Sequence, residues 1–334
     1  MKFKNIISIL ILVSCSYSLF ALENSSINHK KWMSAIDQMA VNSTTGNLVV
    51  GLNNGSVKEY DFTKKSWLNL VDPSSSILIQ MLISPTGRNM IIALGNDKIK
   101  LYNFKTKNIY SVPAFLSPIT YMLITPDSRN LIISFDNGFG YGDIEEYNFS
   151  NNKWKKLHSP DWDSTINSMV ITSDCRFLIA GLSDGSIRLY NFSLKKWVQI
   201  HDSSWKEPVN EMLLTPDNKT LFVGLGYGSV EQYNLSTGKW KELHDDSFLS
   251  GINDIYFNSK TNNLFVGLSN GELEKYNGKN KKWTLLKKWD YSILQITMIQ
   301  NKYFVGLSDG SIKIILVHDI FSIHLPVLCL YSTF

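Results

Sequence analysis

The stretch GLSDGSIRLYNFSLKKW, residues 181–197, decides the fold, because close copies of it recur along most of the chain. A copy recurs every 39 to 47 residues, and each copy contains several strand signals. A fixed period of about 40 residues with this content is typical of a propeller blade and not of a helical repeat. Seven copies open at Gly51, Ala93, Ser134, Gly181, Gly224, Gly267 and Gly306.

Each copy predicts a β-hairpin. In the fourth copy, an apolar run from Phe177 to Leu182 meets Asp184-Gly185, a dipeptide that tolerates the positive φ angles of a two-residue hairpin turn. Polar and apolar residues then alternate up to Tyr190, with the period of a strand that has one solvated face. In five copies a tryptophan follows the tyrosine by seven residues, as Trp197 follows Tyr190.

Four strands are expected in each unit, and we call them a to d in chain order. In the fourth unit, strand a covers residues 165–171, strand b 177–182 and strand c 186–190, and strand d begins near Trp197. The a–b connections contain Pro, Asp, Asn and Gly, as in TPDN at residues 215–218, which is type I turn chemistry. The sequence therefore predicts an all-β fold, a seven-bladed β-propeller of four-stranded antiparallel blades.

The segments SPTGRNMIIALGNDKIKLYNF (84–104) and TPDNKTLFVGLGYGSVEQYNL (215–235) resemble the WD repeat. The resemblance covers residues 35–317 and implies a propeller that binds other proteins. No Gly-His dipeptide precedes strand a, and Tyr190-Asn191 stands where that family has Trp-Asp, so its buried hydrogen-bond network is not carried over. The segment 221–240 also resembles the repeats of pyrroloquinoline-quinone propellers and of propeller lipoproteins that assist outer-membrane assembly.

The N-terminus has the order of a secretory signal peptide, with two lysines, an apolar run from Ile6 to Val13, and small residues up to Ala21. We expect residues 1–21 to be removed, with a retained membrane anchor as one alternative. Leu12 to Cys15 resembles the lipobox of bacterial lipoproteins, so lipidation of Cys15 is a second alternative. The expected location is the periplasm or the medium, and the richness in Asn, Lys and Ile fits a bacterial genome rich in A and T.

The propeller is expected over residues 30–325, with a short tail at 326–334. The seventh unit lacks the tyrosine and the tryptophan, so either Phe321 to Leu325 or Lys30-Lys31-Trp32 could supply its last strand. Trp32 precedes Ile36 by only four residues, where other units leave ten to twelve, which favours the C-terminal segment.

The net charge and the lengths of the apolar runs argue against nucleic acid and membranes as partners. The net charge of +4 falls to +2 once Lys2 and Lys4 are removed, which predicts no general affinity for nucleic acid or anionic membranes. No apolar run is long enough to span a membrane in the mature chain. Cys175 and Cys329 are expected to be unpaired thiols, and the protein to be a monomer.

No enzyme motif, metal site or cofactor site is expected. The chain lacks the nucleophile-elbow, zinc-helix, phosphate-loop and CxxC patterns. His158, His201 and His244 recur on adjacent blades, too widely spaced around the ring to share one zinc ion. Strand a should place Gln38, Gln80, Tyr121, Asn167, Asn210, Asn253 and Gln295 at the central channel, with Asp37, Glu211 and Asp254 nearby.

Strand geometry puts the d–a and b–c connections on one face of the disc. Exposed loop aromatics are typical of recognition surfaces, but they also cover blade ends. We predict a binding patch for a protein partner over blades three to five, formed by Phe139, Tyr141, Trp162, Trp205, Tyr227, Phe248, Asp161 and Asp202.

The leading hypothesis is therefore an exported, non-catalytic propeller that acts as a protein-interaction scaffold. The alternatives are a propeller enzyme of lactonase, lyase or quinoprotein type, an outer-membrane assembly lipoprotein, and a carbohydrate-binding protein.

Overall fold

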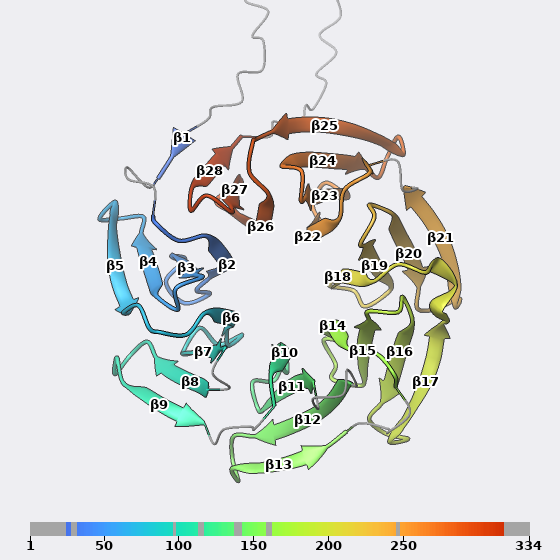
Figure 1. Cartoon of the computed structure of the whole chain (residues 1–334), viewed down its shortest axis with the longest axis horizontal. Helices are drawn as coiled ribbons and strands as arrows, with labels where there is room; N and C mark the ends of the chain where they lie inside the picture. The colour runs from blue at the N-terminus through green and yellow to red at the C-terminus, as the bar shows by residue number, and fades with distance from the viewer. Residues whose placement is uncertain are drawn as a thin grey trace, which may run out of the picture.

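A computed structural model describes residues 25–27, 32–95, 98–112, 117–136, 142–157, 162–244 and 248–316. Its strands form seven four-stranded antiparallel sheets arranged in a ring around a central channel (Figure 1). The predicted all-β, seven-bladed propeller is thus confirmed. The predicted signal peptide with Cys15, the tail at 326–334 and Cys329 lie outside the described residues.

Blades 1 to 6 are meanders with strand a at the channel and strand d at the rim, and blade 7 has the same order of strands across its sheet (Figure 1). Blade 1 contains β2 (Ile36–Val41), β3 (Leu48–Leu52), β4 (Val57–Asp61) and β5 (Ser66–Val71), and blade 2 contains β6 (Leu78–Ile83), β7 (Asn89–Leu94), β8 (Lys98–Asn103) and β9 (Ile109–Val112). Blade 3 contains β10 (Ile119–Ile124), β11 (Asn130–Asp136), β12 (Gly142–Asn148) and β13 (Lys153–Lys156), and blade 4 contains β14 (Ile166–Ile171), β15 (Phe177–Leu182), β16 (Ile187–Asn191) and β17 (Lys196–His201). Blade 5 contains β18 (Val209–Leu214), β19 (Thr220–Leu225), β20 (Val230–Asn234) and β21 (Lys239–His244), and blade 6 contains β22 (Ile252–Asn258), β23 (Asn263–Leu268), β24 (Glu272–Asn277) and β25 (Lys282–Lys288). Blade 7 contains β26 (Ile293–Ile299), β27 (Lys302–Leu307), β28 (Ile312–Ile315) and β1 (Ser25–Ser26). A short helical turn, η1 (Ser203–Trp205), lies in the connection from blade 4 to blade 5.

The predicted hairpin turn joins β15 and β16. Gly185 has a φ of +88°, and Asp184 Oδ1 accepts a hydrogen bond from Ser186 N (2.8 Å). A Cβ on Gly185 would lie 2.6 Å from the backbone oxygen of Glu207, in the connection to the next blade. Glycine is therefore needed here both for its backbone conformation and for the close approach of the two connections.

Strand b is buried because the neighbouring blades cover both of its faces. All five residues of β3 are buried, whereas most residues of the outer strand β5 are exposed or half-buried. A Cβ on Gly181 in β15 would lie 2.4 Å from Val209 Cγ1 of the next blade, so glycine lets the blades pack closely. The apolar core is accordingly divided into seven clusters, each shared by two adjacent blades.

The last blade is completed by N-terminal residues, and the expectation that a C-terminal segment completes it is wrong. β1 pairs antiparallel with β28, with Ser25 opposite Ile314 and Ser26 opposite Lys313. This pairing joins the two ends of the described chain within one sheet. The rim strand of blade 7 therefore comes from the start of the chain, while Phe321 to Leu325 lie outside the described residues.

A repeated tryptophan contact explains the position of this closing segment. The indole Nε1 of Trp67 donates a hydrogen bond to the backbone oxygen of Ile27 (3.3 Å), and Trp197 donates in the same way to Leu157 (2.7 Å). In both pairs the acceptor precedes the tryptophan by 40 residues. Ile27 therefore stands at the end of the rim strand of blade 7, and Trp32 belongs to the following connection.

Candidate functional site

Trp162, in the connection from blade 3 to blade 4, is part of the core. It is only 5% exposed and lies edge-on against Trp197, with ring centroids 4.6 Å apart. Trp162 thus fills the space between two blades and does not form the exposed surface that we predicted. Trp32 makes the same contact with Trp67, at 4.7 Å.

Trp205 and Phe248 are half-buried for the same reason. Each lies edge-on against the tryptophan 35 residues later, which is Trp240 for Trp205 (4.9 Å) and Trp283 for Phe248 (5.3 Å). Each also stacks on a histidine four residues earlier, with centroid distances of 3.3 and 3.4 Å. Burial lowers the pKa of His201, the histidine under Trp205. Both aromatic residues therefore hold a d–a connection onto the next blade.

Two predicted site residues stay open to solvent on this face. Tyr227 is 61% exposed at the b–c turn of blade 5. Asp202 is exposed, and its carboxylate accepts a hydrogen bond from Ser204 N (3.0 Å) at the start of η1. The hydrogen bonds to Ser204 lower the pKa of Asp202. Phe139, Tyr141 and Asp161 lie outside the described residues.

The two faces of the disc carry opposite charge. On the face of the d–a and b–c connections, which we call the partner face, the described connections contain seven acidic residues and one basic residue: Asp72, Asp163, Asp184, Asp202, Glu207, Asp290 and Asp309, against Lys206. On the opposite face, the described a–b and c–d connections contain twelve basic and three acidic residues: Lys64, Lys65, Arg88, Lys105, Lys107, Arg129, Arg176, Lys195, Lys219, Lys260, Lys279 and Lys281, against Asp127, Asp174 and Asp217. The small net charge of the chain therefore hides a strong separation of charge across the disc.

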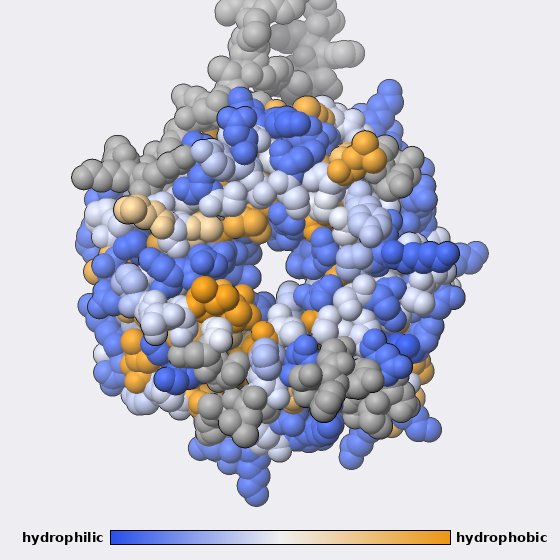
Figure 2. Space-filling view, viewed as in Figure 1, coloured by the Kyte–Doolittle hydropathy of each residue, from blue (hydrophilic) through white to orange (hydrophobic). Residues whose placement is uncertain are grey.

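The partner face also exposes large apolar side chains. Figure 2 shows this face, with the channel open along the axis and apolar groups around its mouth. Among the described connections of the opposite face, only Leu194 is comparably exposed. The exposed apolar residues of the partner face are Met33, Ile77, Tyr227, Leu249 and Tyr291.

One equivalent position of strand a recurs at the channel in all seven blades. In each blade strand a has a bulge one residue before this position, as between Ile252 and Asp254. The bulge assigns the position to Gln38, Gln80, Tyr121, Ser168, Glu211, Asp254 and Gln295. Asn167, Asn210 and Asn253, which we predicted at the channel, lie at the bulge itself. Asn210 and Asn253 nevertheless face the channel, because they line a cavity of about 290 Å³ there together with Asp37 and Gln38.

Five of these channel residues accept a hydrogen bond from the next blade. The backbone amide of Met81 in blade 2 donates to Gln38 Oε1 of blade 1 (3.3 Å), and Met212 of blade 5 donates to Ser168 Oγ of blade 4 (3.1 Å). The same bond joins Ile296 to Asp254 Oδ2 (2.6 Å). It also joins Met122 to Gln80 and Met39 to Gln295. The position therefore needs a hydrogen-bond acceptor, which an amide, a hydroxyl or a carboxyl group can supply.

Two of the seven channel residues carry carboxyl groups whose pKa values are raised by burial. Burial raises the pKa of Asp254 to about 8, although the amides of Ile296 and Ile255 oppose this shift. Burial, and then repulsion from Asp254, raises the pKa of Glu211 well above its usual range. Both line a cavity of about 340 Å³ within the channel, beside Tyr121 and Gln295.

No family model matches the chain, and a search of curated proteins finds no match. Within the part of the chain that the structure describes, no helix has the length and apolar character to cross a membrane. In that same part, no three or more His, Cys, Asp or Glu side chains are grouped so that they could hold a metal ion.

Proposed function

We propose that the protein is an exported, non-catalytic propeller that holds a protein partner on its partner face. The observation that carries the proposal is the coincidence of five exposed apolar side chains with a strong acidic excess on one face. Exposed apolar groups with a polar surround are typical of protein interfaces. The charge favours a partner with basic residues around an apolar contact, because complementary potentials steer association.

A non-catalytic role is supported by the channel. Asp254 accepts the same inter-blade hydrogen bond as Gln38 and Ser168 do in other blades. A structural role thus accounts for this carboxyl group without a reaction. The resemblance of the repeats to WD repeats, a family that implies protein binding, supports the same conclusion.

The test is affinity capture from the cells that produce the protein, followed by binding measurements with the purified partner. Tyr227→Ser with Leu249→Asn removes two apolar groups from the partner face, and Leu194→Ser is the matched control on the opposite face. We expect the double variant to weaken binding at least tenfold and the control to leave it within twofold. Equal binding by both variants would reject the partner face. Export is tested separately, by fractionating cells that produce the tagged full chain.

A further inference from the structure

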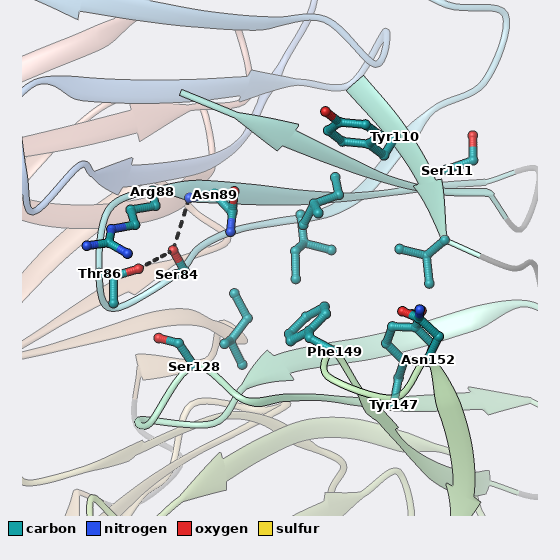
Figure 3. Close-up of a pocket in the computed structure, with 14 residues that line it drawn as sticks. Ser84, Thr86, Arg88, Asn89, Tyr110, Ser111, Ser128, Tyr147, Phe149 and Asn152 are labelled. Atoms are coloured by element: carbon teal, nitrogen blue, oxygen red, sulfur yellow. Dashed lines mark hydrogen bonds between the residues drawn. The ribbon is translucent and has the colours of Figure 1, made fainter. Parts of the chain in front are cut away.

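A second candidate site lies between blades 2 and 3, away from the partner face. Here a cavity of about 430 Å³ is bordered by the a–b turn and the outer strands of blade 2 and by the turns of blade 3 (Figure 3). The volume is within the range of small-molecule sites, roughly 300–1,000 Å³. Its apolar lining includes Ile91, Leu101, Val112, Ile124 and Phe149.

The outer strand of blade 2 explains why this interface is open. In blades 1, 4, 5 and 6, strand d has a bulge near its end. The extra leucine or isoleucine of the bulge, such as Leu70 or Ile200, packs against the next blade. β9 pairs with β8 without a bulge, and Val112 alone stands opposite Ile99. Among the described residues, the interface between blades 2 and 3 therefore lacks one apolar side chain.

The rim of the cavity carries a cation without a carboxylate partner. The a–b turns of blades 3 and 4 read TPDSR and TSDCR, and their arginines pair with the aspartate two residues earlier. The turn of blade 2 reads SPTGR, so Thr86 replaces that aspartate and bonds to Ser84 Oγ (3.2 Å) instead (Figure 3). Among the described residues, no carboxylate pairs with Arg88, which lines the cavity.

The a–b turn of blade 3 forms the facing wall of the same cavity. Ser128 Oγ is shielded from solvent and has no hydrogen-bond partner among the described residues. Ser128 lines the cavity opposite the turn that bears Arg88 (Figure 3).

We propose that this cavity binds a small amphipathic anion. The apolar body of the ligand lies between Leu101 and Phe149, and its carboxylate or similar head group lies at Arg88, within reach of the turn of Ser128. The free cation at the rim selects for an anionic head group, and the apolar lining selects for an aliphatic or aromatic body. The site uses none of the residues of the partner face, so it does not depend on the proposed partner.

The test is calorimetric titration of the full-length mature protein with sodium decanoate, and with decyltrimethylammonium as a cationic probe of the same chain length. We expect decanoate to bind at one site and at least tenfold more tightly than the cationic probe. Arg88→Gln should weaken decanoate binding five- to tenfold, whereas Arg176→Gln, at the equivalent position of blade 4, should change it less than twofold.

A second pair of variants tests the cavity itself. Leu101→Phe should fill it and weaken decanoate binding more than tenfold, and Leu189→Phe, the equivalent change in blade 4, should not. Circular dichroism shows whether each variant is folded. If Leu101→Phe does not fold, the comparison of Arg88→Gln with Arg176→Gln decides the outcome. The proposal is overturned if decanoate does not bind, if both probes bind equally, or if Arg88→Gln and Arg176→Gln have equal effects.

Discussion

Replacing Asp254 by asparagine should stabilise the protein at alkaline pH and leave its stability near pH 4 unchanged. Burial in the channel wall raises the pKa of Asp254 to about 8 in the folded protein, against about 3.9 in an unfolded chain. Between these two values the folded state binds more protons than the unfolded state. The free energy of unfolding therefore falls as the pH rises from 4 to 8, and the loss is complete above pH 8.

The pKa values set the size of the effect. A shift of about four units corresponds to at most ~6 kcal/mol, since one unit is worth about 1.4 kcal/mol. Because water in the open channel screens the charge, we expect Asp254→Asn to gain about 2–3 kcal/mol at pH 9. The new amide oxygen can still accept the hydrogen bond from Ile296, as Gln38 accepts one from Met81. Relief of the repulsion on Glu211 acts in the same direction.

Urea unfolding, followed by tryptophan fluorescence at pH 4, 7 and 9, measures this difference. Gln80→Glu is the reciprocal variant, because it places a carboxyl group at the same channel position of blade 2. Its free energy of unfolding should be close to that of the wild-type protein at pH 4 and lower than it at pH 9. If the wild-type protein and Asp254→Asn lose stability in parallel between pH 5 and 8.5, the channel carboxyl does not titrate as described and the reasoning fails.

Three further predictions concern the packing of the ring. A chain that begins after Ile27 should melt at a clearly lower temperature than one that begins at Ser25, because only the latter keeps β1; equal melting temperatures in calorimetry would contradict this closure. Trp240→Ala should lose about 3–5 kcal/mol in urea unfolding, since it removes both a large inter-blade side chain and its hydrogen bond to Ile200 (3.0 Å), and a loss below 1 kcal/mol would show that the contact is dispensable. Gly271→Ala should lose at least about 2 kcal/mol, because the residue has a φ of +82° and its new Cβ would lie 2.1 Å from the backbone oxygen of Trp289; an unchanged unfolding midpoint would refute this.

The fold was predictable because each blade repeats the same local chemistry. A turn such as Asp184-Gly185 fixes both the reversal of the chain and the register of the strands that it joins. The strand that completes blade 7 was harder to predict, because this blade combines residues from the two ends of the described chain. A usable signal was nevertheless present, since Ile27 precedes Trp67 by 40 residues, as Leu157 precedes Trp197.

The candidate site was less predictable, for two physical reasons. A bulge in strand a shifts the alternation of side chains by one residue, so Asp254 joins Asn253 at the channel and takes the position that Gln38 has in blade 1. The composition of a loop also does not show whether an aromatic side chain points outward. The constant spacing of 35 residues between Trp205 and Trp240, and between Phe248 and Trp283, could have indicated packing onto the next blade.

At two turns of the partner face, the fold does not require the negative charge that an aspartate supplies. Asp184 and Asp309 cap their b–c turns by accepting hydrogen bonds from the serine two residues later (2.8 and 2.9 Å). In blade 1, Asn54 makes the same bond to Ser56 (3.1 Å), and blade 6 uses Asn270. Because a neutral amide already performs this role in two blades, the turn does not require the negative charge. The hydrogen bonds of these two turns therefore do not account for the negative charge of Asp184 and Asp309.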